Sequence, residues 1–366
     1  MKVIHILHEL KYSGAEIMYV DAAPIFQSKG CELTVVATAP DLGEYAPYFE
    51  KAGYKVLHMP YPPLSNYPAR IKFFRRFTKF LKKEGYDVMH IHSQMWGMSL
   101  CAWLAGMKSV YTFHNNFPTN SYSHLYHIML RWTSKHIFKC RFQTISDSVY
   151  NHEIKLYHNP TTKIYNWYSS KKFYPAEQSE KINIRKEFGI SPDALVLISV
   201  GGCSPIKRHS DIIKALPLIL EKVPDCVYLH LGKGVSEGSE VELVKELNVQ
   251  DHVLFCGNQS NVRKYHAASD IYIMPSQYEG IPISTIEAMG CKLPAILYNV
   301  PGLKDFNKDG ENSLLIPEDY TLIAENAIRL FEDKKLAEQI GNKGFAFVNN
   351  YFSMEKNASL IYEMYL

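Results

Sequence analysis

Several common signals are missing from this chain of 366 residues, and each absence narrows what the protein can be. No uninterrupted apolar run reaches the roughly 18 residues that a bilayer-spanning helix needs. The first residues, MKVIHILHELKYSG, have their apolar run broken by histidines and by Glu9. We therefore expect a first β-strand there rather than a signal peptide, and no transmembrane segment.

The chain also lacks any pair of cysteines separated by two residues. Its seven cysteines are an odd number and lie far apart in the sequence. This usage is typical of a reduced cytoplasmic protein and indicates neither a disulfide framework nor a zinc site. The cysteines are Cys31, Cys101, Cys140, Cys203, Cys226, Cys256 and Cys291.

Three motifs of nucleotide and metal chemistry are absent as well. The sequence contains no Walker phosphate-binding loop, no Gly-x-Gly-x-x-Gly and no Asp-x-Asp. A net charge of only +3 gives no general argument for nucleic acid, and no nucleic-acid motif accompanies the local basic runs. We therefore expect no nicotinamide cofactor, no metal and no nucleic-acid partner.

The residues that are present predict two α/β domains. The chain is 46% hydrophobic and 21% charged, as globular proteins are, and is long enough for two domains of about 150–200 residues. Short apolar runs alternate with longer helical stretches, which predicts parallel sheets. The expected strands are 3–7, 33–38, 56–59, 88–92, 109–113 and 142–146, then 195–201, 227–232, 253–257, 271–275 and 294–298.

A polar, aperiodic stretch separates the two series of strands. We predict an N-terminal Rossmann-like domain over residues 1–166, a linker over 167–181 and a C-terminal Rossmann-like domain over 182–345. Residues 346–366 should form a closing helix that packs back on the N-terminal domain. Two such domains would face each other across a cleft at the carboxyl ends of their strands, where these folds bind ligands.

The segment PSQYEGIPISTIEAMGCKLPAIL (275–297) could carry chemistry in the second domain. We expect a helix with Pro282 in its first turn and Gly290 just past its end. Its N-terminus would offer backbone N–H groups to a phosphate. Glu287, about one turn inside, could accept two hydrogen bonds from a vicinal diol such as ribose, while Glu279 stays on the loop. The alternative is that both glutamates are simply solvated.

Two further segments follow strands of the same domain. VGGCSPIKRH (200–209) ends a strand in two glycines and then carries Lys207, which could neutralise a diphosphate leaving group. The alternative is a flexible turn with surface cations. Gly232 ends the next strand, and the segment from Asn258 to Val262 could line a nucleobase. Alone, these glycines and turns are ordinary connections between strands and helices.

In this order and with these gaps, the three segments resemble the C-terminal domain of glycosyltransferase family 4. The resemblance covers the second half of the chain, and Glu279-Gly280-x-Pro282 through Glu287-Ala288-x-x-Gly290 is its most specific stretch. That family is retaining, uses nucleotide sugars and has the GT-B fold. The resemblance implies that Glu287 binds ribose, Glu279 the donor sugar and Lys207 the diphosphate. The donor-binding residues that it implies are Gly14, Gly201, Gly202, Arg208, Gly232, Asn258, Val262, Gly280, Ile281, Pro282, Ile283 and Glu287.

Two positions depart from the family pattern. The family usually has an arginine where this chain has Gly202, so either Arg208 substitutes for it or Lys207 and backbone hold the diphosphate alone. In the linker the family often has Asn-Gly-(Val/Ile)-Asp. Here Asn166 is kept but Trp167 replaces the glycine.

The N-terminal half resembles the family more loosely. Gly14 would let backbone N–H groups sit beside the donor phosphate or the acceptor, and Glu16 would cap the following helix. His114 follows a strand and would contact the donor sugar or the transferring centre, although a lone histidine can also be structural. Ser146 or Asp147, at another strand end, would lie near the acceptor.

The resemblance implies a hexosyltransferase that works without a metal. Lys207 and the helix N-terminus near Pro282 would replace the metal's charge at the leaving nucleoside diphosphate. Retention would follow from attack on the face that the diphosphate leaves, because the N-terminal domain offers no convincing carboxylate nucleophile. We expect a UDP-sugar donor, a glycan or lipid-linked acceptor and a role in surface polysaccharide biosynthesis. The alternatives are a sugar-nucleotide epimerase and a non-catalytic glycan- or membrane-binding relative.

Residues 69–83, ARIKFFRRFTKFLKK, carry seven cations and no acid, with aromatic residues at helical spacing. Such a helix suits an anionic membrane surface, so we expect a cytoplasmic protein that can bind the inner face of a membrane. The alternative is an ordinary helix that buries its phenylalanines on a sheet. A second basic run, RWTSKHIFKCR (131–141), adds positive charge to the same domain.

Overall fold

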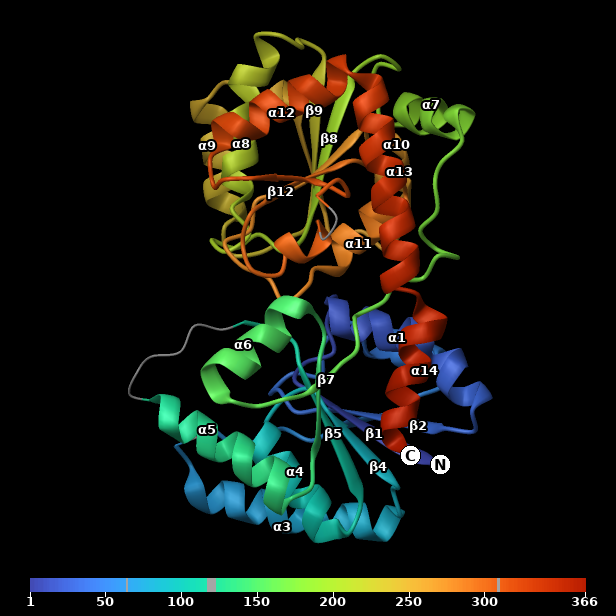
Figure 1. The fold of residues 1–366 in the computed structure, drawn as a ribbon, viewed down its shortest axis with the longest axis vertical. Coiled ribbons are helices and arrows are strands. Elements are labelled where there is room, and N and C mark those ends of the chain that lie inside the picture. The colour runs from blue at the N-terminus through green and yellow to red at the C-terminus, as the bar shows by residue number, and fades with distance from the viewer. Residues whose placement is uncertain (64, 117–122, 308–309) are drawn as a thin grey trace. The chain divides into compact units, whose positions relative to one another are not determined.

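The computed structural model describes residues 1–63, 65–116, 123–307 and 310–366. It divides into two compact units: unit 1 contains residues 1–167 and 354–366, and unit 2 contains residues 168–353. Each unit is a parallel β-sheet flanked by helices (Figure 1). None of the helices in the described ranges is long and apolar enough to cross a membrane.

Unit 1 has a seven-stranded sheet in the order β3-β2-β1-β4-β5-β6-β7. All of its strand pairs are parallel, so their carboxyl ends lie at one edge. The strands are β1 Lys2–Leu7, β2 Glu32–Ala37, β3 Lys55–His58, β4 Val88–Ile91, β5 Lys108–Phe113, β6 Arg141–Thr144 and β7 Thr162–Lys163. The helices are α1 Gly14–Ser28, α2 Ala46–Lys51, α3 Tyr67–Glu84, α4 Met95–Ala105, α5 His124–Trp132, the π-helix η2 Thr133–Ile137, α6 Asp147–Tyr157 and α14 Met354–Tyr365.

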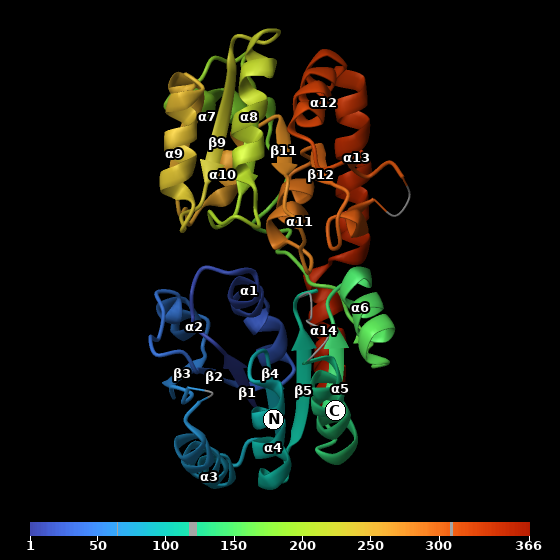
Figure 2. The same cartoon turned by 90° about the vertical axis from the view of Figure 1, so that its left-hand side faces the viewer.

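Unit 2 has a six-stranded parallel sheet in the order β10-β9-β8-β11-β12-β13 (Figure 2). Its strands are β8 Leu195–Val200, β9 Cys226–Leu231, β10 Val253–Gly257, β11 Ile271–Met274, β12 Ala295–Tyr298 and β13 Leu314–Ile316. Its helices are α7 Gln178–Glu187, α8 His209–Leu220, α9 Glu237–Glu246, α10 Val262–Ala268, α11 Ile283–Gly290, α12 Tyr320–Glu332 and α13 Lys334–Tyr351, with 3-10 turns η3 Gln250–His252 and η4 Lys304–Phe306.

The C-terminal helix α14 completes unit 1, although it is the last element of the chain. It packs beside α1 and near β5. The Tyr365 hydroxyl lies 2.7 Å from His90 Nδ1, and Arg141 donates to the Met364 carbonyl over 2.7 Å. These polar contacts hold the end of the chain against the sheet. Helix α13 extends to Tyr351 and therefore crosses the predicted boundary at residue 346.

Trp167, which replaces the family's linker glycine, is a buried anchor of unit 1. Its side chain is 1% exposed and lies against the ring of Tyr19. Its indole N–H donates to the Met18 carbonyl over 3.0 Å. The chain therefore leaves unit 1 from a packed position rather than through a glycine hinge.

The α/β fold class predicted from the sequence is confirmed. Each predicted strand is present, with its ends within about two residues of the expected ones. The sequence analysis missed β7 and β13, which have only two and three residues and therefore too little pattern to recognise.

Candidate functional site

The loops at the carboxyl edge of the unit 2 sheet bring two of the predicted site residues together. Lys207 lies on the loop after β8, and Glu279 lies on the loop after β11, a neighbouring strand. The Lys207 Nζ and a Glu279 carboxylate oxygen are 2.6 Å apart. The two side chains are only 23% and 13% exposed, so water screens the pair less than it would at the surface.

Glycines allow the backbone to crowd at this edge. Gly232 has φ 133°, and a Cβ there would lie 1.9 Å from the carbonyl oxygen of Gly201. A Cβ on Gly201 would in turn lie 3.8 Å from Lys207 Nζ. The loops after β8 and β9 therefore touch beside the Lys207 ammonium group, and a side chain at Gly232 would force them apart.

Glu279 is held by its backbone as well as by Lys207. Its N–H donates to the Pro301 carbonyl over 3.0 Å, and a Cβ on Gly302 would lie 2.2 Å from the Glu279 carbonyl oxygen. The neighbouring Gln277 N–H donates to the Ile206 carbonyl over 2.8 Å, which ties this loop to the one that carries Lys207. The Lys207–Glu279 pair is thus set by three loops together.

The helix after Glu279 is α11, and its ends differ slightly from the prediction. Pro282 has extended backbone and is the N-cap, so the helix begins at Ile283 rather than at the proline. Gly290 is the last helical residue and not the residue after the end. A Cβ there would lie 2.4 Å from the Tyr168 ring, which explains the glycine. Gly280, Ile281 and Pro282 lead into this N-terminus and are buried.

Glu287 lies one turn inside α11 and is only 8% exposed. Burial of a carboxylate is costly unless polar partners accompany it, so a solvated glutamate is the wrong description of this residue. The first turn of α11 is fixed to the sheet by the buried Tyr272, whose hydroxyl contacts the Ser284 and Thr285 hydroxyls at 3.0 and 3.2 Å.

Arg208 turns to a different set of partners. It has φ 52° at the N-cap of α8, and its guanidinium pairs with Glu318 and, at 3.1 Å, with Asp211. The guanidinium also lies over the ring of Tyr298. Lys207 and Arg208 are therefore neighbours in sequence whose charged groups pair with separate carboxylates.

The remaining unit 2 candidates lie at the same edge. Gly202 is exposed, and a Cβ there would lie 3.4 Å from the Lys233 carbonyl oxygen. Asn258 is exposed just after β10, and Val262 is half-buried as the first residue of α10.

In unit 1, His114 is half-buried just after β5 and belongs to a row of histidines. Its Nε2 lies 2.9 Å from His92 Nδ1, and His92 Nε2 lies 3.3 Å from His5 Nδ1. The three residues come from β1, the end of β4 and the end of β5, which are adjacent strands. Burial lowers the pKa of His114 to about 4 and that of His5 to about 3, and puts the pKa of His92 well below its usual value.

Because these imidazoles are neutral, each contact in the row needs one N–H and one lone pair. His5 Nε2 is buried and has no hydrogen-bond partner within the described part of the chain. An unpaired lone pair on Nε2 costs less than an unpaired N–H, so the His5 proton is favoured on Nδ1, from which it is donated to His92 Nε2. His92 then donates from its Nδ1 to His114 Nε2. His114 then carries its proton on Nδ1, as a neutral hydrogen-bond donor.

A cavity of about 550 Å³ opens beside this row within unit 1. His92 and His114 line it together with aromatic and basic side chains, and most of the exposed lining is apolar. The aromatic and basic lining residues include Tyr61, Arg70, Trp96, Tyr126, Arg131 and Tyr157. The guanidinium of Arg131 already pairs with the Glu153 carboxylate through two hydrogen bonds of 2.7 and 2.8 Å.

The other unit 1 candidates have structural partners. Gly14 is the first residue of α1, and Ser13 is its N-cap. Glu16 lies in the first turn, so the prediction that Glu16 caps this helix is wrong. The Ser13 hydroxyl donates to Glu16, and burial raises the pKa of that carboxyl. Ser146 caps α6 by accepting from the Val149 N–H over 3.1 Å.

Asp147 lies in the first turn of α6 and contacts the Lys163 ammonium group. It also accepts from the Tyr165 hydroxyl over 2.9 Å. Asp147 therefore connects α6 to the segment that follows β7.

The comparisons with known proteins agree with this arrangement. The model of the family described as "Glycosyltransferase Family 4" matches residues 12–201, and that of "Glycosyl transferases group 1" matches residues 180–347. The first of these spans more than half of the chain. The chain belongs to glycosyltransferase family 4. It is therefore an enzyme, a glycosyltransferase with the GT-B fold, and the epimerase and non-catalytic alternatives are not favoured.

Two curated relatives of this glycosyltransferase are similar over most of their length. N-acetyl-alpha-D-glucosaminyl L-malate synthase of Bacillus anthracis is 26% identical over 82% of this chain and 78% of its own. UDP-Gal:alpha-D-GlcNAc-diphosphoundecaprenol alpha-1,3-galactosyltransferase of Escherichia coli is 27% identical over 79% of this chain and 77% of its own.

Two solved structures share the fold. Anabaena Alr3699/HepE, solved in complex with UDP and glucose, has a TM-score of 0.84 at 18% identity and covers 99% of this chain and 98% of its own. WaaG, a glycosyltransferase involved in lipopolysaccharide biosynthesis, has a TM-score of 0.75 at 17% identity and covers 98% of this chain and 99% of its own.

Sequence reasoning missed two clusters. The first is the row formed by His5, His92 and His114, which only the strand order brings together. The second is a buried group of a cysteine, two histidines and a glutamate in unit 2. Histidines inside otherwise apolar strands, as in VIHIL and VYLHLG, were the available signal.

Proposed function

We propose that this glycosyltransferase moves a hexose from a UDP-sugar to a glycan or lipid-linked acceptor, with retention and without a catalytic metal. The observation that carries the proposal is the Lys207–Glu279 ion pair at the edge where α11 begins. A lysine, a glycine-lined turn and a helix N-terminus are the groups that a metal-free site needs to bind a diphosphate.

In the bound state, Lys207 would exchange part of its contact with Glu279 for the diphosphate. The diphosphate would lie at the N-terminus of α11, next to Gly280 and Pro282, where the helix dipole favours negative charge. Charge that develops on the leaving UDP would then meet groups already in place, which lowers the barrier without reorganisation. Arg208 is the weaker candidate for this role because Asp211 and Glu318 already neutralise it.

The two glutamates have separate tasks in this proposal. Glu287 is buried one turn inside α11 and would accept hydrogen bonds from the ribose hydroxyls, which satisfies a carboxylate that is costly to bury alone. Glu279, beside Lys207, would contact the hydroxyl groups of the donor sugar.

His114 would act as a neutral donor and not as a charged acid. Its pKa of about 4 keeps the imidazole uncharged at neutral pH, and the histidine row places a proton on Nδ1. Such a group can donate a hydrogen bond to a hydroxyl of the donor sugar without placing a positive charge beside the oxocarbenium-like ring that develops during transfer. Attack from the face that the diphosphate leaves would give retention.

The UDP-sugar and the lipid-linked acceptor are supported by the names of similar proteins. The Escherichia coli relative is named for UDP-Gal and for a diphosphoundecaprenol-linked acceptor, and HepE was solved with UDP-glucose. The cavity in unit 1 fits an acceptor of this kind, because its aromatic side chains can stack on sugar rings or prenyl chains. A role in surface polysaccharide biosynthesis follows from such an acceptor.

A membrane contact through unit 1 is part of the proposal. Six of the seven cations of residues 69–83 are exposed, whereas Arg70 is half-buried and donates to the Tyr61 hydroxyl. Phe77 and Leu81 are buried, so the helix has an apolar buried face and a basic exposed face that could meet a membrane. Ile71, an apolar residue of the same helix, is 54% exposed. In the basic run 131–141, the charge of Arg131 is compensated by Glu153.

Helix α5 supplies the apolar part of the same surface. It has no buried residue, and Leu125, Met129 and Trp132 are 78%, 53% and 56% exposed. It continues into η2, η2 contacts α4, and α4 packs on α3, so these helices form one face of unit 1 (Figure 1). Cations beside exposed apolar and aromatic residues suit the interface of an anionic bilayer.

A ligand screen tests the proposed donor. Thermal unfolding is measured with UDP, GDP, ADP and their common sugar derivatives, because a ligand that binds the folded state raises the melting temperature. We expect UDP and at least one UDP-sugar to stabilise the protein, and GDP and ADP to have little effect. Stabilisation by GDP or ADP alone would overturn the UDP assignment while leaving the glycosyltransferase intact.

A further inference from the structure

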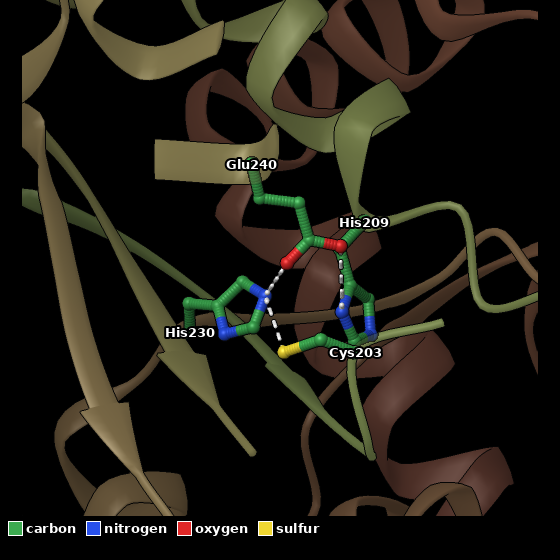
Figure 3. A group of neighbouring side chains, drawn as sticks. All are labelled: Cys203, His209, His230 and Glu240. Carbon is green, nitrogen blue, oxygen red and sulfur yellow. Dashed lines mark hydrogen bonds and ion pairs between the residues drawn. The ribbon is translucent and has the colours of Figure 1, made fainter. Parts of the chain in front are cut away.

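Four metal-ligating side chains converge inside unit 2, beneath the loop that carries Lys207. They are Cys203 on that loop, His209 at the start of α8, His230 on β9 and Glu240 on α9 (Figure 3). Each offers one ligand atom, and the four atoms all lie within 4.8 Å of one another. Three of the four lie within two positions of a predicted donor-binding residue: Cys203 follows Gly202, His209 follows Arg208, and His230 is two residues before Gly232. None of the four is itself a predicted donor-binding residue.

The distances between neighbouring side chains of the cluster are close to those of a small tetrahedral site, with the two Glu240 oxygens facing different histidines. The Cys203 sulfur lies 3.8 Å from His230 Nε2, and His209 Nδ1 lies 3.8 Å from a Glu240 oxygen. His230 Nε2 and the other Glu240 oxygen are 3.0 Å apart. Metal–ligand bonds of about 2.0–2.3 Å in a tetrahedron put the ligand atoms roughly 3.3–3.8 Å from one another, so a zinc ion fits with only small shifts.

The charges and hydrogen bonds of the cluster are unbalanced without a cation. Glu240 is 3% exposed, and its recorded charge partners in the described chain are only the two histidines. Both ring nitrogens of His209 and Nδ1 of His230 are buried, and none of the described residues offers them a hydrogen-bond partner. Such orphaned groups are costly, and a coordinated metal would use one nitrogen of each ring.

We propose that Cys203, His209, His230 and Glu240 form a structural Zn²⁺ site. A thiolate and a carboxylate supply two negative charges, which balance a divalent cation in a water-poor interior. One sulfur and two imidazole nitrogens favour Zn²⁺ over the hard cations Mg²⁺ and Ca²⁺, which take oxygen ligands. Binding releases the Cys203 thiol proton to solvent, while the imidazoles bind through lone pairs.

Four protein ligands leave no open position, so this metal would hold the fold and not touch the substrate. It would join β9, α9, the start of α8 and the loop after β8. Because Cys203 and His209 flank Lys207 on both sides, the metal would fix the segment that presents the lysine. The sequence analysis indicated no zinc site because the ligands are spread over 38 residues and include a single cysteine (203 to 240).

The first test is the metal content of the full-length protein. The chain is expressed with zinc in the medium, purified without chelators or an affinity-metal column, and measured by elemental mass spectrometry. We expect about one zinc per chain. Removal with a strong chelator should lower the melting temperature by about 5 °C or more, and added Zn²⁺ should restore it. Replacement by Co²⁺ should give the visible bands of a tetrahedral site and a near-ultraviolet sulfur-to-cobalt band.

Matched variants separate coordination from simple loss of packing. Cys203→Ala should remove the sulfur-to-cobalt band and the bound zinc, while Cys226→Ala deletes an equally buried thiol at the other end of β9 and should keep both. His230→Gln should likewise lose zinc, and His266→Gln, at another buried histidine with two unpaired nitrogens, should not. If Cys203→Ala does not fold, the cobalt spectrum of the unmodified protein still decides.

Two results would overturn the proposal. One is purified protein with no zinc that neither binds Co²⁺ in a tetrahedral, sulfur-ligated form nor gains stability from Zn²⁺. The other is zinc that Cys203→Ala and His230→Gln retain at the level of the unmodified protein, since it must then lie elsewhere. Neither result bears on the proposed donor site, which the UDP titrations test separately.

Discussion

Replacing Lys207 with alanine should weaken the binding of UDP while leaving the binding of uridine unchanged. Lys207 Nζ lies 2.6 Å from a Glu279 oxygen, and its side chain is 23% exposed, so a bound diphosphate would meet a partly desolvated ammonium group. A unit charge pair at about 4 Å and an effective dielectric constant near 20 is worth roughly 4 kcal/mol. That figure is an upper bound, because Lys207 must give up part of its contact with Glu279.

The net loss should therefore be close to that of one charge-assisted hydrogen bond, about 1.5–3 kcal/mol. This corresponds to a rise in the Kd of UDP of roughly 10- to 150-fold. Isothermal titration of UDP and of uridine against both proteins measures it. Lys207→Arg should recover much of the affinity, and Lys214→Ala, on α8 with a 45% exposed side chain, is the matched control that should bind UDP normally.

The comparison of the two ligands makes the prediction specific. Equal losses for UDP and uridine would mean that Lys207 shapes the site in general and does not bind the diphosphate. No loss for either ligand would remove Lys207 from the donor site altogether.

Three further predictions concern other parts of the molecule. Glu287→Gln should raise the Kd of UDP by roughly 10-fold or more but leave that of 2′,3′-dideoxy-UDP unchanged, since only the ribose hydroxyls contact the carboxylate; equal effects on both ligands would refute the ribose assignment. His5 has a folded pKa of about 3 against 6.5 unfolded, so the unfolded state binds more protons and stability falls as pH drops from about 6.5 towards 3. His5→Leu should make the melting temperature less sensitive to pH in that window, and an unchanged slope would contradict this. Neutralising Arg75, Arg76 and Lys79 to glutamine should weaken sedimentation with anionic liposomes at low salt, and binding that ignores both the substitutions and salt would rule out the membrane face.

The parallel sheets could be predicted from the sequence because their strands are buried on both faces and have nearly continuous apolar sequences, such as LVLISV (195–200), in which Ser199 is the one polar residue. The meeting of the loops after β8 and β11 could be predicted as well, since parallel strands end at a common edge of the sheet. That edge brings Lys207 and Glu279 together although they are 72 residues apart in sequence. The family resemblance added the expected roles of Glu279 and Glu287, which their spacing alone did not distinguish from solvated glutamates.

Other features depend on packing that one-dimensional patterns do not record. The direction of Arg208 is decided by Asp211 and Glu318, the latter 110 residues away. Helix α11 begins one residue later than predicted because the backbone of Pro282 is extended. Ile71 fits the apolar spacing of α3, but it lines a shallow groove beside Leu100 and Leu104 of α4 and is 54% exposed.

The histidine row and the Cys203 cluster illustrate the same limit for chemistry. Each histidine sits in an apolar strand or at a strand or helix end, where it is individually unremarkable. Only the strand orders β1-β4-β5 and β9-β8 place these residues next to one another. Clusters assembled from several elements become visible once the sheet order is known.

The most direct test of the account is the turnover of nucleotide sugars with and without an acceptor. The purified enzyme is incubated with UDP-glucose, UDP-galactose or UDP-N-acetylglucosamine, no added divalent metal, and a polyprenyl-diphosphate-linked sugar, and released UDP and glycosylated product are measured. We predict that at least one UDP-sugar gives UDP and an α-linked product in equal amounts, that release depends on the acceptor, and that Lys207→Ala lowers it strongly. Interconversion of the sugars without release of UDP, or transfer only from a sugar nucleotide with another base, would contradict the account.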